Sequence, residues 1–72
     1  MLKIMDKWLE AMLPVAIERF NRYRTTEVAL RQAASDTVIA ELYRRKLEMS
    51  KEARRELTSA LASMIRGQLA KK

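Results

Sequence analysis

Residues 50–65 read SKEARRELTSALASMI, and no other part of the chain shows its secondary structure as clearly. Placed every 100° around a helix, its apolar side chains fall on one face and its charged and serine side chains on the other. Ser50 is a typical N-cap residue, and Glu52 stands in the first turn, where a carboxylate is favourable. Gly67 is expected to end this helix. The apolar stripe consists of Ala53, Leu57, Ala60, Leu61, Met64 and Ile65.

The segment before it, residues 26–48, is also helical in pattern but contains a change of phase. Thr25 and Thr26 can cap a helix that runs to about Ala34. Three cap-type residues then follow at 35–37, and the apolar residues beyond them point in a different direction. Either a new helix begins near Asp36, or one long helix meets different partners along its length, and both alternatives stay open. The later apolar residues are Val38, Ile39, Leu42, Tyr43 and Leu47.

The first helix is expected to run from about Leu2 to Arg24. Its apolar face keeps the same phase before and after Pro14, although a proline inside a helix removes one backbone hydrogen bond. We therefore expect one helix, kinked at Pro14 and convex toward water, rather than two independent helices. The residues of the core face are Leu2, Met5, Leu9, Met12, Leu13, Ala16, Phe20 and Tyr23.

These patterns predict an all-α fold, a small bundle of three to four amphipathic helices. With 72 residues the chain makes one domain, expected over residues 1–67, followed by a frayed basic tail at 68–72. A chain this short buries a smaller fraction of its surface on folding than a larger domain does, so a folded monomer would be marginally stable. It also has no cysteine or metal site that could stabilise the fold. Because 49% of the residues are apolar, we expect self-association to complete the core.

The composition argues against catalysis. The chain has no His and no Cys, so no serine can be activated and no usual metal or zinc site can form. No phosphate-binding loop or dinucleotide motif occurs, and we expect no cofactor, no metal and no enzyme. The longest uncharged run, residues 57–65, is too short to cross a membrane. Charged residues near the N-terminus argue against a secretory signal, so a cytoplasmic location is expected.

The basic residues suggest a partner. The net charge is +6, and six cations flank a short turn near Met49 and Ser50. An antiparallel helix pair would bring them to one end of the molecule, where they could contact phosphates. Against this, Glu41 could pair with Arg44 or Arg45, and Glu52 with Arg55, as ordinary surface pairs. The candidate nucleic-acid-binding residues are Arg44, Arg45, Lys46, Lys51, Arg54 and Arg55.

A second basic stretch, residues 19–24, interleaves arginines with Phe20 and Tyr23. Such a pattern can hold single strands by charge and stacking. Both aromatic residues share the core face of the first helix, so burial is favoured over stacking. Glu18 and Arg22 are also spaced to form an ion pair.

Trp8 stands on an apolar N-terminal stretch with three alternative roles. It can belong to the core, anchor an interface with a protein partner or second copy, or lie on a membrane surface. The membrane alternative is disfavoured because Asp6 and Glu10 offset Lys3 and Lys7. The candidate interface residues are Met1, Ile4, Met5, Trp8 and Met12.

Two functions follow as hypotheses. The favoured one is a non-enzymatic regulatory or accessory protein that binds nucleic acid or a nucleoprotein assembly through its basic end. The alternative is a protein-interaction module, such as an inhibitor, adaptor or assembly factor, that docks a partner through an apolar helix face. The clustered cations favour the first hypothesis, and the wide apolar face around Trp8 favours the second.

Overall fold

The structure is a computed structural model that describes residues 3–23 and 25–70, with the side chains of residues 3–6 left out. It contains three helices: α1 (Lys3–Arg22), α2 (Glu27–Arg45) and α3 (Lys51–Ala70). No strand occurs within the described ranges. The expectation of an all-α bundle is confirmed, and the number of helices is three.

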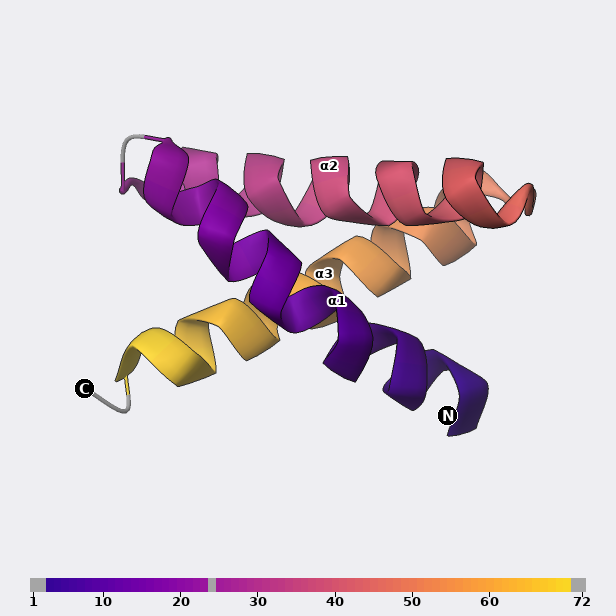
Figure 1. Cartoon of the computed structure of the whole chain (residues 1–72), viewed down its shortest axis with the longest axis horizontal. Coiled ribbons are helices and arrows are strands. Elements are labelled where there is room, and N and C mark those ends of the chain that lie inside the picture. The colour runs from indigo at the N-terminus through magenta and orange to yellow at the C-terminus, as the bar shows by residue number, and fades with distance from the viewer. Residues whose placement is uncertain (1–2, 24, 71–72) are drawn as a thin grey trace.

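The three helices all pack against one another. In Figure 1, α2 runs along the top of the molecule, and α3 returns below it in the opposite direction. In this view α1 crosses α3 diagonally. The N-terminal end of α1 therefore lies on the same side of the molecule as the connection between α2 and α3. This arrangement places the end of α2, the start of α3 and the start of α1 at one end of the bundle.

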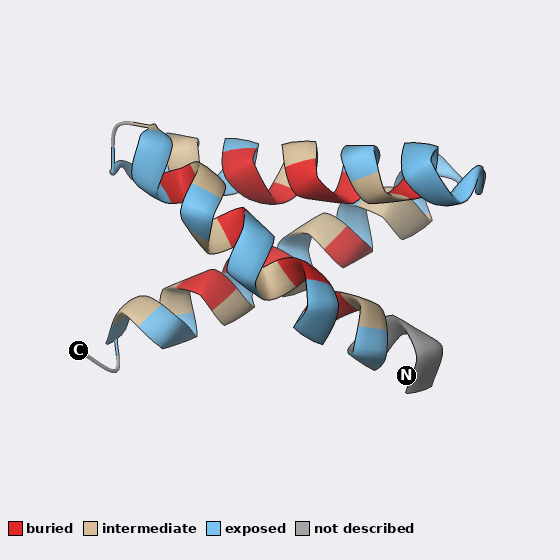
Figure 2. Ribbon diagram, in the orientation of Figure 1, coloured by how far each residue is buried: buried red, intermediate tan, exposed pale blue. Residues whose placement is uncertain are grey.

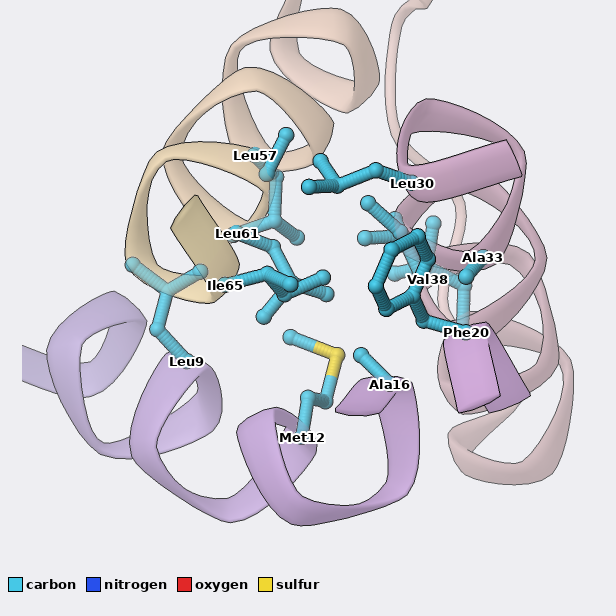
Figure 3. Close-up of a cluster of buried hydrophobic side chains, with 13 residues drawn as sticks. Leu9, Met12, Ala16, Phe20, Leu30, Ala33, Val38, Leu57, Leu61 and Ile65 are labelled. Atoms are coloured by element: carbon cyan, nitrogen blue, oxygen red, sulfur yellow. The ribbon is translucent and has the colours of Figure 1, made fainter. Parts of the chain in front are cut away.

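The core is built from one stripe of each helix, coloured red in Figure 2. Figure 3 shows Met12 of α1 pointing toward Leu61 and Ile65 of α3, with α2 closing the other side. As expected from the sequence, Leu9, Phe20, Leu57 and Leu61 are buried, while Leu13 and Met64 are half-buried at its edge. The buried apolar residues are Leu9, Met12, Ala16, Phe20, Leu30, Ala33, Ala34, Val38, Leu42, Leu57, Leu61, Ala62 and Ile65.

α1 passes through Pro14 as one helix. Pro14 is exposed, whereas Ala16 and Met12 on either side of it are buried. The apolar face therefore stays in phase past the proline, as the sequence predicts. A bend of the helix axis at Pro14 remains a prediction.

α2 is a single helix, which decides between the two alternatives left open for residues 26–48. It begins at the Thr26 cap, whose side chain accepts a hydrogen bond from the Ala29 N–H at 3.1 Å. No new helix starts at residues 35–37, where two of the three cap-type side chains, Asp36 and Thr37, have other partners. Thr37 donates from Oγ1 to the Ala33 carbonyl at 2.7 Å, and Asp36 accepts a hydrogen bond from the Tyr23 hydroxyl at 2.7 Å.

The end of α2 is formed by Lys46, whose backbone is left-handed with φ 55° and ψ 41°. The Lys46 N–H donates to the Tyr43 carbonyl at 3.1 Å, and the Leu47 N–H donates to the Leu42 carbonyl at 3.0 Å. This is the Schellman pattern, which usually has glycine at the left-handed position. After a short connection, Ser50 caps α3 as expected and accepts a hydrogen bond from the Ala53 N–H at 3.1 Å.

The helix stop expected at Gly67 is wrong, because α3 continues through Gly67 to Ala70. Gly67 does not adopt a positive φ, so its backbone makes no left-handed cap. Leu69 packs against the core, and this contact favours three further residues of helix over a turn at the glycine.

Candidate nucleic-acid interface

The connection at residues 46–50 brings the last turn of α2 next to the first turns of α3. The six cations expected to form a patch, which we call the basic end, therefore lie at one end of the bundle (Figure 1). Arg54 is half-buried and the other five are exposed. The basic end comprises Arg44, Arg45, Lys46, Lys51, Arg54 and Arg55.

Within the basic end, Arg44 and Arg45 are already paired. Both guanidinium groups donate to Oε1 of Glu41, at 2.7 Å and 2.6 Å. The hydrogen bond from Arg44 is the largest cause that holds the pKa of Glu41 below its usual range; burial opposes it, and the hydrogen bond from Arg45 adds to the lowering. The guanidinium carbon of Arg45 also lies 5.0 Å from the centre of the Trp8 ring, within the range of a cation–π interaction. Glu41 therefore offsets one of these two positive charges, and Arg45 is directed toward Trp8 of α1.

The other four cations have no such partner. Among the side chains described, residues 7–23 and 25–70, none forms an ion pair with Lys46, Lys51, Arg54 or Arg55. The surface pair expected between Glu52 and Arg55 is not formed in that set. Three of the four lie in the first turns of α3, where the helix dipole disfavours positive charge.

Beside these cations, the surface has an apolar depression of about 330 Å³. Ile39, Tyr43 and Leu47 are exposed there by 49%, 86% and 43%. Leu42 and Met49 also line the depression, together with Glu48 and with Arg54 from α3. Ile39 and Arg54 line a second, adjoining groove between α2 and α3 as well.

Sequence reasoning missed this depression. Helical periodicity correctly grouped Val38 and Leu42 with Ile39, Tyr43 and Leu47, but it treated all five as one packed face. Val38 and Leu42 are buried, whereas the other three are left without a covering element. The available signal was the width of the apolar face, which exceeds what α3 alone can cover.

The expected interface around Trp8 is only partly described. Trp8 is half-buried and packs against the core while Arg45 lies over its ring. Met12 is 2% exposed, so it belongs to the core and not to an exposed interface. The expected positions Met1, Ile4 and Met5 lie outside the described side chains.

The second basic stretch, residues 19–24, is engaged within the fold. Phe20 is buried, as favoured from the sequence. Arg19 donates to Thr37 Oγ1 at 3.1 Å, and the expected pair of Arg22 with Glu18 is present at 2.6 Å. The hydrogen bond to Asp36 raises the pKa of Tyr23, with a smaller contribution from burial. Arg24 lies outside the described residues.

At the far end of the bundle, Glu27 of α2 joins α3. Its carboxylate accepts hydrogen bonds from Arg66 and lies 3.6 Å from Nε of Arg31. The hydrogen bond from Arg66 lowers the pKa of Glu27. Every described arginine except Arg54 and Arg55 thus has a side-chain partner: Arg19, Arg22, Arg31, Arg44, Arg45 and Arg66.

Two kinds of site are absent from the described residues. No three His, Cys, Asp or Glu side chains gather where they could hold a metal ion. None of the helices, within the residues described, is long and apolar enough to cross a bilayer.

No protein-family model matches the chain, and no curated protein or solved structure is significantly similar to it. The basic end is therefore characterised by its own geometry alone.

Proposed function

We propose that the protein is a non-enzymatic regulatory or accessory protein that binds nucleic acid, or a nucleoprotein assembly, through the basic end. One observation carries the proposal: among the described arginines, Arg54 and Arg55 alone lack a side-chain partner, and they stand beside Lys46 and Lys51. Guanidinium groups that have no internal partner are available to phosphate oxygens.

The acidic residues nearby decide from which side a phosphate approaches. Residues 41–56 contain six cations and four carboxylates, a net charge of +2 (6 − 4). Glu41 is engaged by Arg44 and Arg45 on the side facing α1. Phosphates are therefore expected to meet the side facing α3, where Lys51, Arg54 and Arg55 project. Contacts with phosphates fix the position of the protein on the nucleic-acid backbone, and they give little preference for particular bases.

The test removes charge without weakening the fold. The variant Lys51→Gln/Arg54→Gln/Arg55→Gln takes three positive charges away from the start of α3, where the helix dipole disfavours them, so helicity should be kept. Its matched control is Arg22→Gln/Arg31→Gln/Arg66→Gln, which removes the same charge from exposed or partly exposed positions at the opposite end of the bundle. Binding of labelled duplex and single-stranded oligonucleotides is measured by fluorescence anisotropy at two salt concentrations.

The basic-end variant should bind at least 10-fold more weakly than the control variant. Its dependence on salt should also fall, because each phosphate contact contributes about 0.9 to the logarithmic slope on duplex DNA and about 0.7 on a single strand. If binding is weakened equally in both variants, the effect comes from the net charge of the protein and not from the basic end. Absence of binding by the wild-type protein at low salt would remove the proposal and leave docking of a protein partner as the remaining function.

Self-association and a cytoplasmic location belong to the same proposal. The short chain, together with the apolar N-terminal stretch around Trp8, supports a dimer or larger assembly. Sedimentation equilibrium at micromolar concentration is expected to give a mass above that of one chain. A monomer under those conditions would contradict it, without affecting the assignment of the basic end.

A further inference from the structure

We propose that the ligand of the basic end is a nucleic-acid single strand, and that the depression beside Tyr43 holds one unpaired base stacked on the Tyr43 ring. This inference rests on the proposed function and adds to it the kind of strand and the place of one nucleotide. The juxtaposition behind it is an exposed aromatic ring in an apolar depression with an unpaired arginine on its wall.

Tyr43 differs from every other described aromatic residue. Phe20 is buried, Tyr23 donates its hydroxyl to Asp36, and Trp8 packs against the core beneath Arg45. Tyr43 alone is 86% exposed, and its hydroxyl makes no hydrogen bond within the described part of the chain. A base stacked on such a ring would cover apolar surface that the fold leaves in water.

The backbone that carries the ring is held in place, which lowers the entropic cost of binding. Tyr43 lies in the last turn of α2, and its carbonyl accepts the hydrogen bond from the Lys46 N–H that closes the helix. The next residue back, Leu42, is anchored in the core. A side chain with two rotatable bonds on a fixed turn loses little freedom when a base stacks on it.

The charges fit a base attached to a phosphate. Arg54 lines the depression and also the adjoining groove, where Arg55, Thr58 and Ser59 follow along α3. A strand with its base on Tyr43 would lead its phosphates past Arg54 and Arg55 and could place the next nucleotide in that groove. Cations beside an aromatic platform are the combination that single-strand-binding surfaces use.

Glu48 on the rim argues further for one strand. Its carboxylate repels phosphates, so a backbone can pass on the α3 side of the depression but is disfavoured on the Glu48 side. A duplex carries two backbones and covers the faces of its bases by internal stacking. An unpaired base avoids both problems, and its amino group can donate a hydrogen bond to a carboxylate.

The experiment compares Tyr43→Ala, Tyr43→Phe and Glu48→Gln with the wild-type protein. The probes are a fluorescein-labelled 15-nucleotide single strand of mixed sequence and the corresponding duplex, with binding measured by anisotropy at two salt concentrations. Circular dichroism checks folding, which the exposed position of Tyr43 should leave intact.

Tyr43→Ala should weaken single-strand binding about 5- to 150-fold, the range for loss of one stacked base. Its salt slope should not change, because no charge is removed. Tyr43→Phe keeps the stacking face and should bind within about 2-fold of wild type, and Tyr43→Ala should leave duplex binding unaltered. Glu48→Gln should bind either probe more tightly, because a negative charge leaves the phosphate path.

Four results would overturn the inference. If Tyr43→Ala binds the single strand as wild type does, while Lys51→Gln/Arg54→Gln/Arg55→Gln binds it weakly, the stacked base is rejected and the proposed function is kept. Wild-type binding to duplex as tight as to single strand would reject the preference for one strand. A shift from oligomer to monomer caused by Tyr43→Ala, seen by sedimentation, would assign the depression to a second copy. Failure of the wild-type protein to bind either probe would reject the proposed function itself.

Discussion

The two tyrosines of the chain stand in opposite circumstances. Tyr23 follows α1, is half-buried, and donates its hydroxyl to Asp36 Oδ2 at 2.7 Å. Tyr43 ends α2 at the opposite end of the bundle and is 86% exposed. The same residue type thus closes a contact inside the protein in one region and remains available in the other. The difference teaches that, among the described aromatic side chains, full exposure is confined to Tyr43 at the basic end.

The region around Tyr23, which we call the α1–α2 seam, consists of Arg19, Tyr23, Asp36 and Thr37. Thr37 is 3% exposed, and its hydroxyl both donates to the Ala33 carbonyl and accepts from Arg19. Asp36 accepts hydrogen bonds from Tyr23 and also from Gln32 at 2.8 Å. Polar groups in the seam are therefore satisfied within the fold, as partly buried groups must be.

The largest expected effect tests whether both regions depend on one core. Leu61 is 0% exposed, and Leu61→Ala should cost about 2–5 kcal/mol because it removes buried methyl groups and leaves a cavity. Thermal melts followed by far-ultraviolet circular dichroism and by Trp8 fluorescence should shift to the same lower midpoint. Two separate midpoints would mean that the basic end unfolds independently, and an unshifted melt would mean that Leu61 is not a core residue.

A smaller effect compares the two tyrosines directly. Tyr23→Phe should lower the free energy of unfolding by about 1 kcal/mol, because it removes the hydrogen bond to the Asp36 carboxylate. Tyr43→Phe should change stability by less than about 0.5 kcal/mol, the usual limit for exposed sites without partners. Urea unfolding at pH 7 measures both variants under the same conditions. Equal costs at the two positions would contradict the contrast drawn between the regions.

A gain in stability is expected at Lys46. Its left-handed backbone is strained for any residue with a Cβ atom, and Lys46→Gly should relieve about 0.5–1 kcal/mol of that strain. The same change removes one cation of the basic end, so the protein should become more stable while its salt dependence of binding becomes shallower. Lys46→Asn, which also tolerates this backbone conformation, controls for the lost charge. A destabilised glycine variant would contradict the assigned cap.

The smallest effect is expected from Glu41. Because its pKa is lower in the folded protein, its contribution to stability is present above the unfolded value, 4.5, and is lost as the pH falls through the folded pKa. Glu41→Gln should therefore cost a few tenths of a kcal/mol at pH 7 and nothing at pH 2. Urea unfolding at the two pH values measures this difference. If the cost is the same at both, the carboxylate is not responsible.

Glu41→Gln also sharpens the comparison at the level of binding. It leaves Arg44 and Arg45 without their acidic partner, which makes the α1 side of the basic end resemble the α3 side. Anisotropy at pH 7 should then show tighter binding of the single strand and a steeper salt slope. Weaker binding would mean that the paired arginines act in their present positions.

Much of the fold could be predicted from the sequence because its strongest local signals agree with the tertiary packing. Thr26 and Ser50 both cap helices as their residue types suggest, and the stripe of α3 is the one that is buried. In these places propensity, capping and burial favour the same structure, which is the condition for a reliable prediction.

The errors occur where a tertiary contact overrides a local signal. The break suggested at residues 35–37 is absent because Asp36 and Thr37 accept hydrogen bonds in the α1–α2 seam. The residue pattern of one helix cannot reveal such contacts with another segment. Gly67 does not end α3 because Leu69 reaches the core. Lys46 ends α2 although nothing in its residue type indicates a left-handed backbone.

The charged residues of the candidate site could be predicted from the sequence, but not which apolar side chains beside them stay exposed. The sequence places the six cations together, because the turn between them is short. It also indicated that Glu41 could pair with Arg44 or Arg45, because these spacings lie within one helix, and the structure has Glu41 pair with both. It could not show that Ile39, Tyr43 and Leu47 stay uncovered by the helices described, because that depends on which face of α2 the other two helices cover.

The two short connections, residues 23–26 and 46–50, have a consequence for how quickly the chain finds this fold. Each joins helices that are neighbours in sequence and partners in space, so little chain entropy is lost before their contacts form. Helical bundles with such local topology fold in microseconds to milliseconds. We expect a single fast refolding phase in a temperature-jump experiment, in which α1 meets α3 once the two local helix pairs have formed. A newly made chain would then reach its binding-competent form soon after α3 has been released from the ribosome.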